Sequence, residues 1–193
     1  MQVIGITGKA GSGKDTVGDI LRDKYDFATT KLAFPIQKIV CGLFGFDVDK
    51  WQDREWREAV QPIYDCSPRR LAQTLGTEWG RNSVKHSLWL DLTFDLIKKE
   101  VLDPVAITDV RFNNEAEFIR GNGGFMIHVH RSNLEGIEHR GHQSERGITV
   151  DPRDFHINNY STLDVLEEQV DHVMDHIQSI LASRPDKAEE EAA

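Results

Sequence analysis

The sequence GKAGSGKDT, at residues 8–16, decides the fold of this chain. Its glycines Gly8 and Gly13 stand five positions apart and a lysine follows, which is the spacing of a loop that binds phosphate groups. An apolar run at residues 2–7 precedes the loop and predicts a strand. Apolar residues at helical spacing follow it and predict a helix over residues 14–25. This order places successive backbone N–H groups around an anion at the positive end of a helix.

The residue types of the loop predict how it binds ATP. Its backbone N–H groups surround the phosphates, Lys14 bridges the outer phosphates, and Thr16 holds Mg²⁺. The predicted ATP site consists of Gly8, Ala10, Gly11, Ser12, Gly13, Lys14, Asp15 and Thr16. The alternative is a glycine-rich turn that binds no ligand, but the strand and the helix on either side favour a phosphate loop.

Asp15 occupies a position where the common pattern has serine or threonine, and the hydroxyl group comes one residue later. A lysine, any residue and then a threonine is the arrangement in nucleoside monophosphate kinases such as adenylate kinase. The spacing therefore favours a kinase of small molecules over a motor protein or a GTPase switch.

Further strands and helices alternate along the chain. The predicted strands cover 105–110, 124–130 and 155–158, and the predicted helices cover 35–44, 68–77, 87–99, 113–120 and 161–181. Ser161 is expected to cap the last helix. The alternation predicts an α/β fold, here a P-loop NTPase with a parallel sheet of about five strands and helices on both faces. We expect one kinase domain over 1–182, with a helical excursion at about 47–100 that binds the acceptor.

The polar stretch at 131–154 has no periodicity, and loops of that length in compact domains often act as lids. It carries Arg131, Arg140 and Arg146, and closure would bring an arginine onto the transferring phosphoryl group. Arg131 directly follows a predicted strand and is the first candidate, although the sequence does not resolve which of the three enters. An ordinary mobile loop is the alternative.

The composition excludes several classes of protein. Of 193 residues, 23 are basic and 32 acidic, and the net charge of −9 has the wrong sign for binding nucleic acid over the whole surface. No apolar run approaches the roughly twenty residues of a membrane-spanning helix. The two cysteines form no CxxC pair, which is typical of a reducing compartment. We therefore expect a cytoplasmic protein that binds neither a nucleic acid polymer nor a membrane, with a disordered acidic tail at 183–193.

Asp109 and Arg111 follow the apolar residues of the strand at 105–110, so both are expected beside the phosphate loop. Asp109 would organise Mg²⁺ directly or through its waters, and Arg111 would bind the acceptor phosphate as a planar fork. The alternatives are a cap by Asp109 on the helix at 113–120 and a surface ion pair of Arg111 with Glu115.

Two pairs of histidines allow a metal interpretation. His172 and His176 stand one turn apart on the last helix, but a solvated helix face is favoured because no third ligand accompanies them. His128 and His130 share one side of a predicted strand, where we expect packing in the core or at the sheet edge.

Several short motifs distinguish the chain from other phosphate-loop proteins. They are SGKDT at 12–16, SPR at 67–69, QTLGTEWGR at 73–81, DVRF at 109–112 with Glu115, His142 with Ser144 and Glu145, and INN at 157–159. In this combination, from about residue 3 to about residue 173, the chain resembles the deoxynucleoside monophosphate kinases encoded by bacteriophages. The loop alone is shared by many kinases, whereas the combination is much narrower.

The resemblance implies a fold like that of nucleoside monophosphate kinases. It also implies direct in-line transfer of the γ-phosphoryl group of ATP, with Mg²⁺, to a deoxynucleoside 5′-monophosphate, which gives the diphosphate and ADP. The catalytic residues would be Lys14, Arg111 and Arg131. The substrate-binding residues would be Lys9, Arg69, Trp79, Asp109, Arg111, Ser144 and Glu145, and Thr16 and Asp109 would serve the metal.

The family pattern selects Arg69 over its neighbour Arg70 as an acceptor contact, against the alternative that both are solvated. Trp79 would stack on the acceptor base, and the alternative for a large aromatic residue at a helix end is core packing. Phe34 and Gln37 stand where the family has an acidic residue and a lysine, so the resemblance assigns no acceptor contact there.

Two other functions remain open from the sequence. Another P-loop kinase, such as a dephospho-coenzyme A or phosphomevalonate kinase, would use a different acceptor. A regulatory or assembly ATPase would hydrolyse ATP without any acceptor. The sequence determines neither the base preference nor the oligomeric state, and it is compatible with a homodimer. A phage-encoded protein would act in the cytoplasm of its host.

Overall fold

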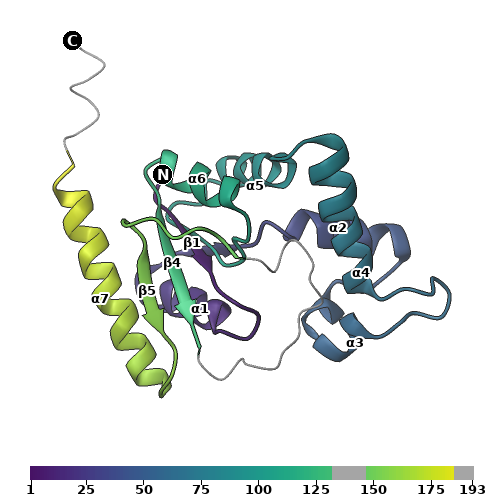
Figure 1. The fold of residues 1–193 in the computed structure, drawn as a ribbon, viewed down its shortest axis with the longest axis horizontal. Coiled ribbons are helices and arrows are strands. Elements are labelled where there is room, and N and C mark those ends of the chain that lie inside the picture. Colours follow the sequence, from purple (N-terminus) through teal and green to yellow (C-terminus); the bar gives the residue numbers. More distant parts are fainter. Residues whose placement is uncertain (132–146, 185–193) are drawn as a thin grey trace, which may run out of the picture.

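The computed structural model describes residues 1–131 and 147–184. In this part of the chain, five parallel strands form one sheet in the order β2-β3-β1-β4-β5 (Figure 1). The strands are β1 (Val3–Thr7), β2 (Ala28–Thr30), β3 (Val105–Ile107), β4 (Phe125–His130) and β5 (Phe155–Asn158). The central strand β1 pairs with β3 on one side and with β4 on the other. The predicted α/β fold with a parallel sheet of five strands is confirmed.

Strand β1 shows how one strand serves two hydrophobic cores. Ile4 and Ile6 pack in a buried cluster with residues of α1 (Lys14–Tyr25) and α7 (Leu163–Ala182). Val3 belongs to a second cluster, which contains residues of α5 (Leu88–Lys99) and α6 (Asn113–Gly121). Successive side chains of a strand point to opposite faces of the sheet, so the two clusters lie on opposite faces. Helices therefore cover both faces, as predicted.

A helical lobe is inserted between β2 and β3. Before α5 it contains α2 (Phe34–Phe44), the 3₁₀ helix η1 (Asp49–Gln52), α3 (Arg54–Glu58), α4 (Pro68–Gln73) and the π-helix η2 (Thr74–Val84). Ile36, Val40, Trp51 and Trp89 belong to the buried core of this lobe. In Figure 1, α2, α3 and α4 lie together to one side of the sheet.

The helix predicted at 68–77 begins as expected but ends later. The Ser67 hydroxyl caps it by accepting a hydrogen bond from the Arg70 N–H at 3.2 Å. At its other end α4 passes directly into η2 and the helix continues to residue 84. The wider turns of η2 pack around Trp89, whose indole N–H donates to the Gly76 carbonyl at 2.7 Å. Gly80 leaves the space for that ring, because a Cβ atom there would lie 2.5 Å from the indole nitrogen.

Two other sequence predictions need correction, and one strand was missed. The strand β2 is only three residues long and was not predicted. The strand predicted at 105–110 ends at Ile107, where the chain turns towards α6. The cap of α7 is Thr162 rather than Ser161, since the Thr162 side chain accepts the hydrogen bond from the Val165 N–H.

Part of the predicted lid and most of the predicted tail are not described. Arg140, Ser144, Glu145 and Arg146 lie outside the described residues, as do 185–193. Within the part of the chain that the structure describes, no helix is both long enough and apolar enough to cross a membrane.

The histidines of the sheet edge form a stack. The ring of His156 on β5 lies 4.9 Å from that of His128 and 5.2 Å from that of His130. His128 is buried, as predicted, and its Nε2 atom lies 2.8 Å from the Asp154 carboxylate, which Arg120 also contacts at 2.9 Å. Over residues 1–131 and 147–184, no group of three or more His, Cys, Asp or Glu side chains could hold a metal ion. The stack is therefore assigned to packing.

Protonation of His128 should lower the free energy of unfolding as the pH falls from about 7 to about 5, whereas the buried Glu115, with its pKa raised to about 7, contributes in the opposite direction. Burial lowers the pKa of His128 below its ordinary 6.5, although the Asp154 carboxylate opposes this effect. The unfolded chain therefore takes up this proton at a higher pH than the folded chain, so acid favours unfolding. In urea unfolding, the free energy of unfolding at pH 7 minus that at pH 5 should be smaller in His128→Gln than in the wild type, and should stay at the wild-type value in His172→Gln on the exposed face of α7. An unchanged difference in His128→Gln would contradict this assignment.

Candidate active site

The phosphate loop connects β1 to α1, as the sequence predicts. Gly8, Gly11 and Gly13 have φ angles of 149°, 77° and 102°, which are conformations that favour glycine. A Cβ atom on Gly8 would also lie only 2.4 Å from the carbonyl oxygen of Val129 on β4. The loop can therefore pass this closely over the sheet only without side chains at these positions.

Lys14 reaches back over the loop. Its Nζ atom donates hydrogen bonds to the carbonyl oxygens of Gly8 and Lys9, each at 2.9 Å. In the described part of the chain, the buried Ser12 hydroxyl has no hydrogen-bond partner. A cation and an unsatisfied hydroxyl thus lie in one glycine-rich turn, at the N-terminus of α1 with its positive partial charge.

Two side chains that follow the carboxyl ends of β4 and β5 hold the loop in place. Asn159, directly after β5, donates its amide N–H to the Ser12 carbonyl at 2.9 Å. Arg131, directly after β4, donates to the Gly11 carbonyl at 3.3 Å. A Cβ atom on Gly13 would lie 2.3 Å from the Asn159 amide nitrogen, so this glycine makes room for the contact. Asn159 belongs to the INN motif, but sequence reasoning gave it no role.

Asp15 departs from the common loop pattern, and its side chain contacts two residues that follow strands β2 and β3. Its carboxylate lies 2.8 Å from Lys31 Nζ and accepts a hydrogen bond from the Thr108 hydroxyl at 3.2 Å. Burial alone would raise the pKa of Asp15, but Lys31 and Thr108 outweigh it and the pKa is lowered. The charged carboxylate therefore links the first turn of α1 to the segments after β2 and β3.

Asp109 is buried at the carboxyl edge of the sheet, beyond the end of β3. Its two carboxylate oxygens accept hydrogen bonds from the backbone N–H groups of Leu32 at 2.6 Å and Ala33 at 3.0 Å. These bonds replace the predicted alternative, a cap on α6. Since Mg²⁺ is usually bound by one or two protein oxygens, substrate phosphates and water, Asp109 and the Thr16 hydroxyl fit a metal held mainly by nucleotide phosphates. Asp109 would contribute through water.

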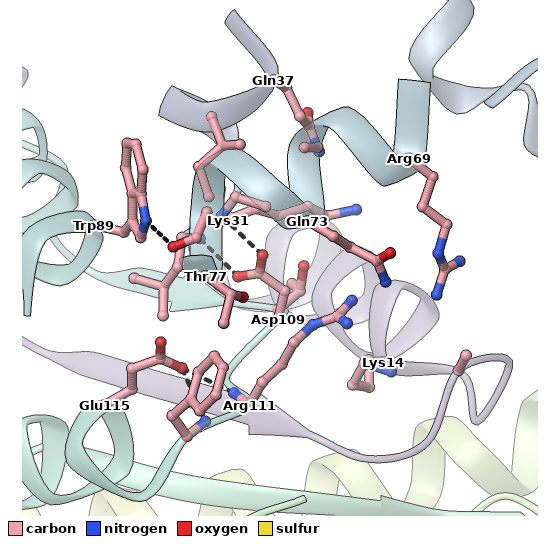
Figure 2. Close-up of a pocket in the computed structure, with 18 of the residues that line it drawn as sticks. Lys14, Lys31, Gln37, Arg69, Gln73, Thr77, Trp89, Asp109, Arg111 and Glu115 are labelled. Carbon is pink, nitrogen blue, oxygen red and sulfur yellow. Dashed lines mark hydrogen bonds between the residues drawn. The ribbon is translucent and has the colours of Figure 1, made fainter. Parts of the chain in front are cut away.

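A cavity of about 310 Å³ lies between the phosphate loop and the helical lobe (Figure 2). Lys14, Arg69, Asp109 and Arg111, four of the predicted site residues, line it together. In Figure 2 the side chains of Arg69, Arg111 and Lys14 lie on one side of the cavity, across from Trp89. The structure thus brings together residues from α1, α4 and the segment after β3, as the sequence predicts.

Four arginines line this cavity, namely Arg57, Arg69, Arg81 and Arg111, and of these Arg81 is paired with the buried Glu115. Arg69, which forms an ion pair with Glu58 at 2.8 Å, and Arg111 were predicted, whereas Arg57 of α3 was not. Arg57 donates to the Trp51 carbonyl at 3.1 Å. Burial, followed by the charge of Arg69, lowers the pKa of Arg57, and the charge of Arg111 acts in the same direction. Glu58, which pairs with Arg69, opposes this effect, so the cluster combines several cations with one nearby carboxylate.

Trp79 lies apart from this cavity. It is 50% exposed and is not among the residues that line it, although the sequence predicts that it stacks on a base. Its neighbours Gln73, Gly76 and Thr77 face the cavity instead, together with Trp89. Gln73, Gly76 and Thr77 belong to the QTLGTEWGR motif, from which the family resemblance selected only Trp79.

A second cavity, of about 370 Å³, lies on the other side of the phosphate loop. Lys9 and Arg131, both predicted site residues, line it, as does Tyr160. Lys14 and Arg111 line both cavities. The two cavities therefore adjoin at the phosphate loop, where Lys14 and Arg111 stand between them.

Glu115 forms an ion pair, but not with the side chain that the sequence suggested. Its Oε1 atom lies 3.1 Å from Arg81, and its Oε2 atom accepts the backbone N–H of Arg111 at 2.9 Å. Burial raises the pKa of Glu115 to about 7, while Arg81 and the backbone donors favour its charged form. Arg81 lies in the QTLGTEWGR motif but was given no role by the sequence.

The sequence matches the model of one known protein family. The family described as deoxynucleotide monophosphate kinase matches residues 46–170, more than half of the 193 residues. The chain belongs to the deoxynucleotide monophosphate kinase family. This finding confirms the resemblance drawn from the short motifs.

Viral relatives extend the match beyond these residues. A deoxynucleotide monophosphate kinase relative from Acanthamoeba polyphaga mimivirus is 28% identical over 193 aligned residues, covering 91% of this chain and 97% of the relative. The deoxynucleoside-5′-monophosphate kinase of Escherichia phage T5 is 25% identical over 216 residues, covering 76% of this chain and 84% of the phage protein. Among solved structures, TT1252 from Thermus thermophilus matches with a TM-score of 0.50 at 19% identity, covering 90% and 96% of the two chains. That likeness concerns the fold alone.

In this deoxynucleotide monophosphate kinase, Asn159→Ala should weaken ATP binding about fivefold, since one neutral hydrogen bond contributes about 1 kcal/mol. Asn159→Asp should weaken it more, because a carboxylate cannot donate to Ser12 and repels phosphate. Calorimetric titration with ATP measures both effects. Asn158→Ala is the matched control, because the contacts of Asn158 are made by its backbone. Equal ATP affinities for the wild type and the three variants would show that Asn159 does not contribute to ATP binding.

Proposed function

We propose that this protein phosphorylates deoxynucleoside 5′-monophosphates to diphosphates with ATP, by direct in-line transfer. The observation that carries the proposal is that two cavities meet at Lys14 and Arg111, on either side of the phosphate loop. A kinase with a phosphate acceptor needs two nucleotide sites that bring two phosphates together between shared cations. Family membership and the name of the phage T5 relative support the same activity.

The charges suggest which substrate occupies which cavity. Arg57, Arg69 and Arg111 suit the acceptor monophosphate in the first cavity, because planar guanidinium groups bind phosphate oxygens in pairs. Gln73 and Thr77 then lie where the sugar and base would extend. The second cavity, beside Lys9 and Arg131, suits the rest of ATP.

The mechanism needs positioning and charge rather than a covalent intermediate. Lys14 would leave the loop carbonyls for the β- and γ-phosphates, and Arg111 would hold the acceptor in line. Arg131 borders the donor side, where it can stabilise the charge that develops on the transferring group. Mg²⁺ bound to the ATP phosphates, with Thr16 and Asp109 nearby, would neutralise further charge.

The finer details of substrate and setting are also proposals. The acceptor is a small deoxynucleotide rather than a nucleic acid polymer, and the setting is a cytoplasm, that of the host if the gene is phage-encoded. A homodimer stays a prediction. The guanidinium groups of Arg57, Arg69 and Arg111 around one cavity favour a phosphate acceptor over an ATPase that acts without any acceptor.

A coupled assay of ADP release with each deoxynucleoside monophosphate tests the proposal. Turnover should require an acceptor, and Lys14→Ala should lower kcat about 100-fold or more. The fold should persist, since Lys14 contacts surface carbonyls rather than the core. Lys24→Ala, at the other end of α1, is the control. Turnover only with dephospho-coenzyme A or phosphomevalonate, or ADP release without any acceptor, would replace the proposal by one of its alternatives.

Arg57→Ala should raise the KM for the monophosphate about tenfold, since hydrogen bonds to charged groups contribute about 1.5–3 kcal/mol. The KM for ATP should change little, because Arg57 lines only the first cavity of the two. Arg54→Ala, one turn earlier on α3 and exposed, provides the comparison. If Arg54→Ala and Arg57→Ala behave alike, Arg57 does not bind the acceptor.

A further inference from the structure

One buried ion pair connects the helical lobe to the segment after β3. Arg81 on η2 and Glu115 on α6 are each 5% exposed, and their side chains lie 3.1 Å apart. Buried charges are stable only when they are paired and hydrogen-bonded. Each of these residues therefore needs the other, and their pairing fixes η2 relative to α6.

The second oxygen of Glu115 binds backbone rather than side chain. Its Oε2 atom accepts the N–H groups of Arg111 at 2.9 Å and of Phe112 at 3.1 Å. Figure 2 shows this carboxylate at the base of Arg111, whose side chain extends from there into the cavity. The carboxylate thus holds the peptide units from which the Arg111 side chain starts.

Arg81 is itself held on several sides. Its guanidinium lies over the Phe112 ring, 3.6 Å from the centroid, and donates to the Asn114 side-chain oxygen at 2.8 Å. A third contact, at 3.2 Å, joins it to Nδ1 of His86. The planar guanidinium therefore has contacts in its plane and on its face, which a lysine could not reproduce.

We infer that Glu115 is a positioning residue for the acceptor, which acts through Arg111 while Arg81 supplies its counter-charge. This inference rests on the proposed function. The geometry supports it because the two carboxylate oxygens of Glu115 have different partners. One oxygen anchors Glu115 to the lobe that lines the acceptor cavity, and the other orients the backbone of Arg111. The contact with the Phe112 N–H also caps α6, whereas the contact with the Arg111 N–H reaches one residue further back, to the residue whose side chain enters the cavity.

Glu115→Gln separates these two roles, because an amide has only one acceptor oxygen. It can serve either Arg81 or the backbone N–H groups, but not both. The KM for the monophosphate should rise about fivefold to tenfold, with the KM for ATP unchanged within about twofold. Glu117→Gln, on the exposed side of the same helix, should leave both values as in the wild type. A loss of stability alone would not separate the two KM values.

A double-mutant cycle decides whether Glu115 acts through Arg111. In an Arg111→Ala background, Glu115→Gln should have no further effect on the KM for the monophosphate. Additive effects would instead show that Glu115 contacts the substrate itself or acts elsewhere, and would overturn the inference. Arg81→Lys should also raise the KM for the monophosphate without raising the KM for ATP, by a smaller factor than Glu115→Gln. It also serves as the test if Glu115→Gln does not fold.

The outcomes also distinguish this inference from the proposed function. If the wild-type protein phosphorylates no deoxynucleoside monophosphate, the proposed function fails. If the wild type is active and neither Glu115→Gln nor Arg81→Lys changes the KM for the monophosphate selectively, only the role of Glu115 fails.

Discussion

The hydrogen bonds from the N–H groups of Leu32 and Ala33 to Asp109 join the helical lobe to the sheet. Buried backbone N–H groups need partners, and here a carboxylate at the end of β3 supplies them immediately before α2 begins. The ion pair of Lys31 with Asp15 adds a second tie beside the first. Since the lobe starts at the carboxyl edge of the sheet, its later helices face the phosphate loop across a cavity. The placement of the lobe residues that line this cavity follows from this anchor.

The acidic residues around the site explain how a chain of net charge −9 can present a cationic cavity. Asp15 pairs with Lys31, Asp109 accepts backbone N–H groups, and Glu115 is shared between Arg81 and the backbone. Each carboxylate is thus engaged within the protein. The basic groups that line the cavity then dominate the local potential, whatever the net charge of the surface.

The sequence predicts those parts of the site that local patterns encode. The loop with Lys14 and the strand end with Arg111 follow from spacing and from the rule that ligands bind at the carboxyl ends of parallel strands. Trp79 was expected at the acceptor base from the family resemblance, and in the structure Gly76 and Thr77 of η2 line the cavity instead. Arg57 gave no signal, since α3 has only five residues and cannot show a period. Asn159 depends on a contact across 147 residues, which no local pattern contains.

Under the proposed function, the guanidinium groups of Arg57, Arg69 and Arg111 in the acceptor cavity favour the phosphate group of the substrate. Without an anion, burial and the charges of Arg69 and Arg111 disfavour the charged form of Arg57 and lower its pKa. A bound phosphate reverses the sign of the local potential, so its binding relieves this repulsion in addition to forming hydrogen bonds. A nucleoside without a phosphate gains neither contribution. Affinity in this cavity is therefore set chiefly by the phosphate, and the neutral side chains Gln73 and Thr77 are left to modulate the choice of base.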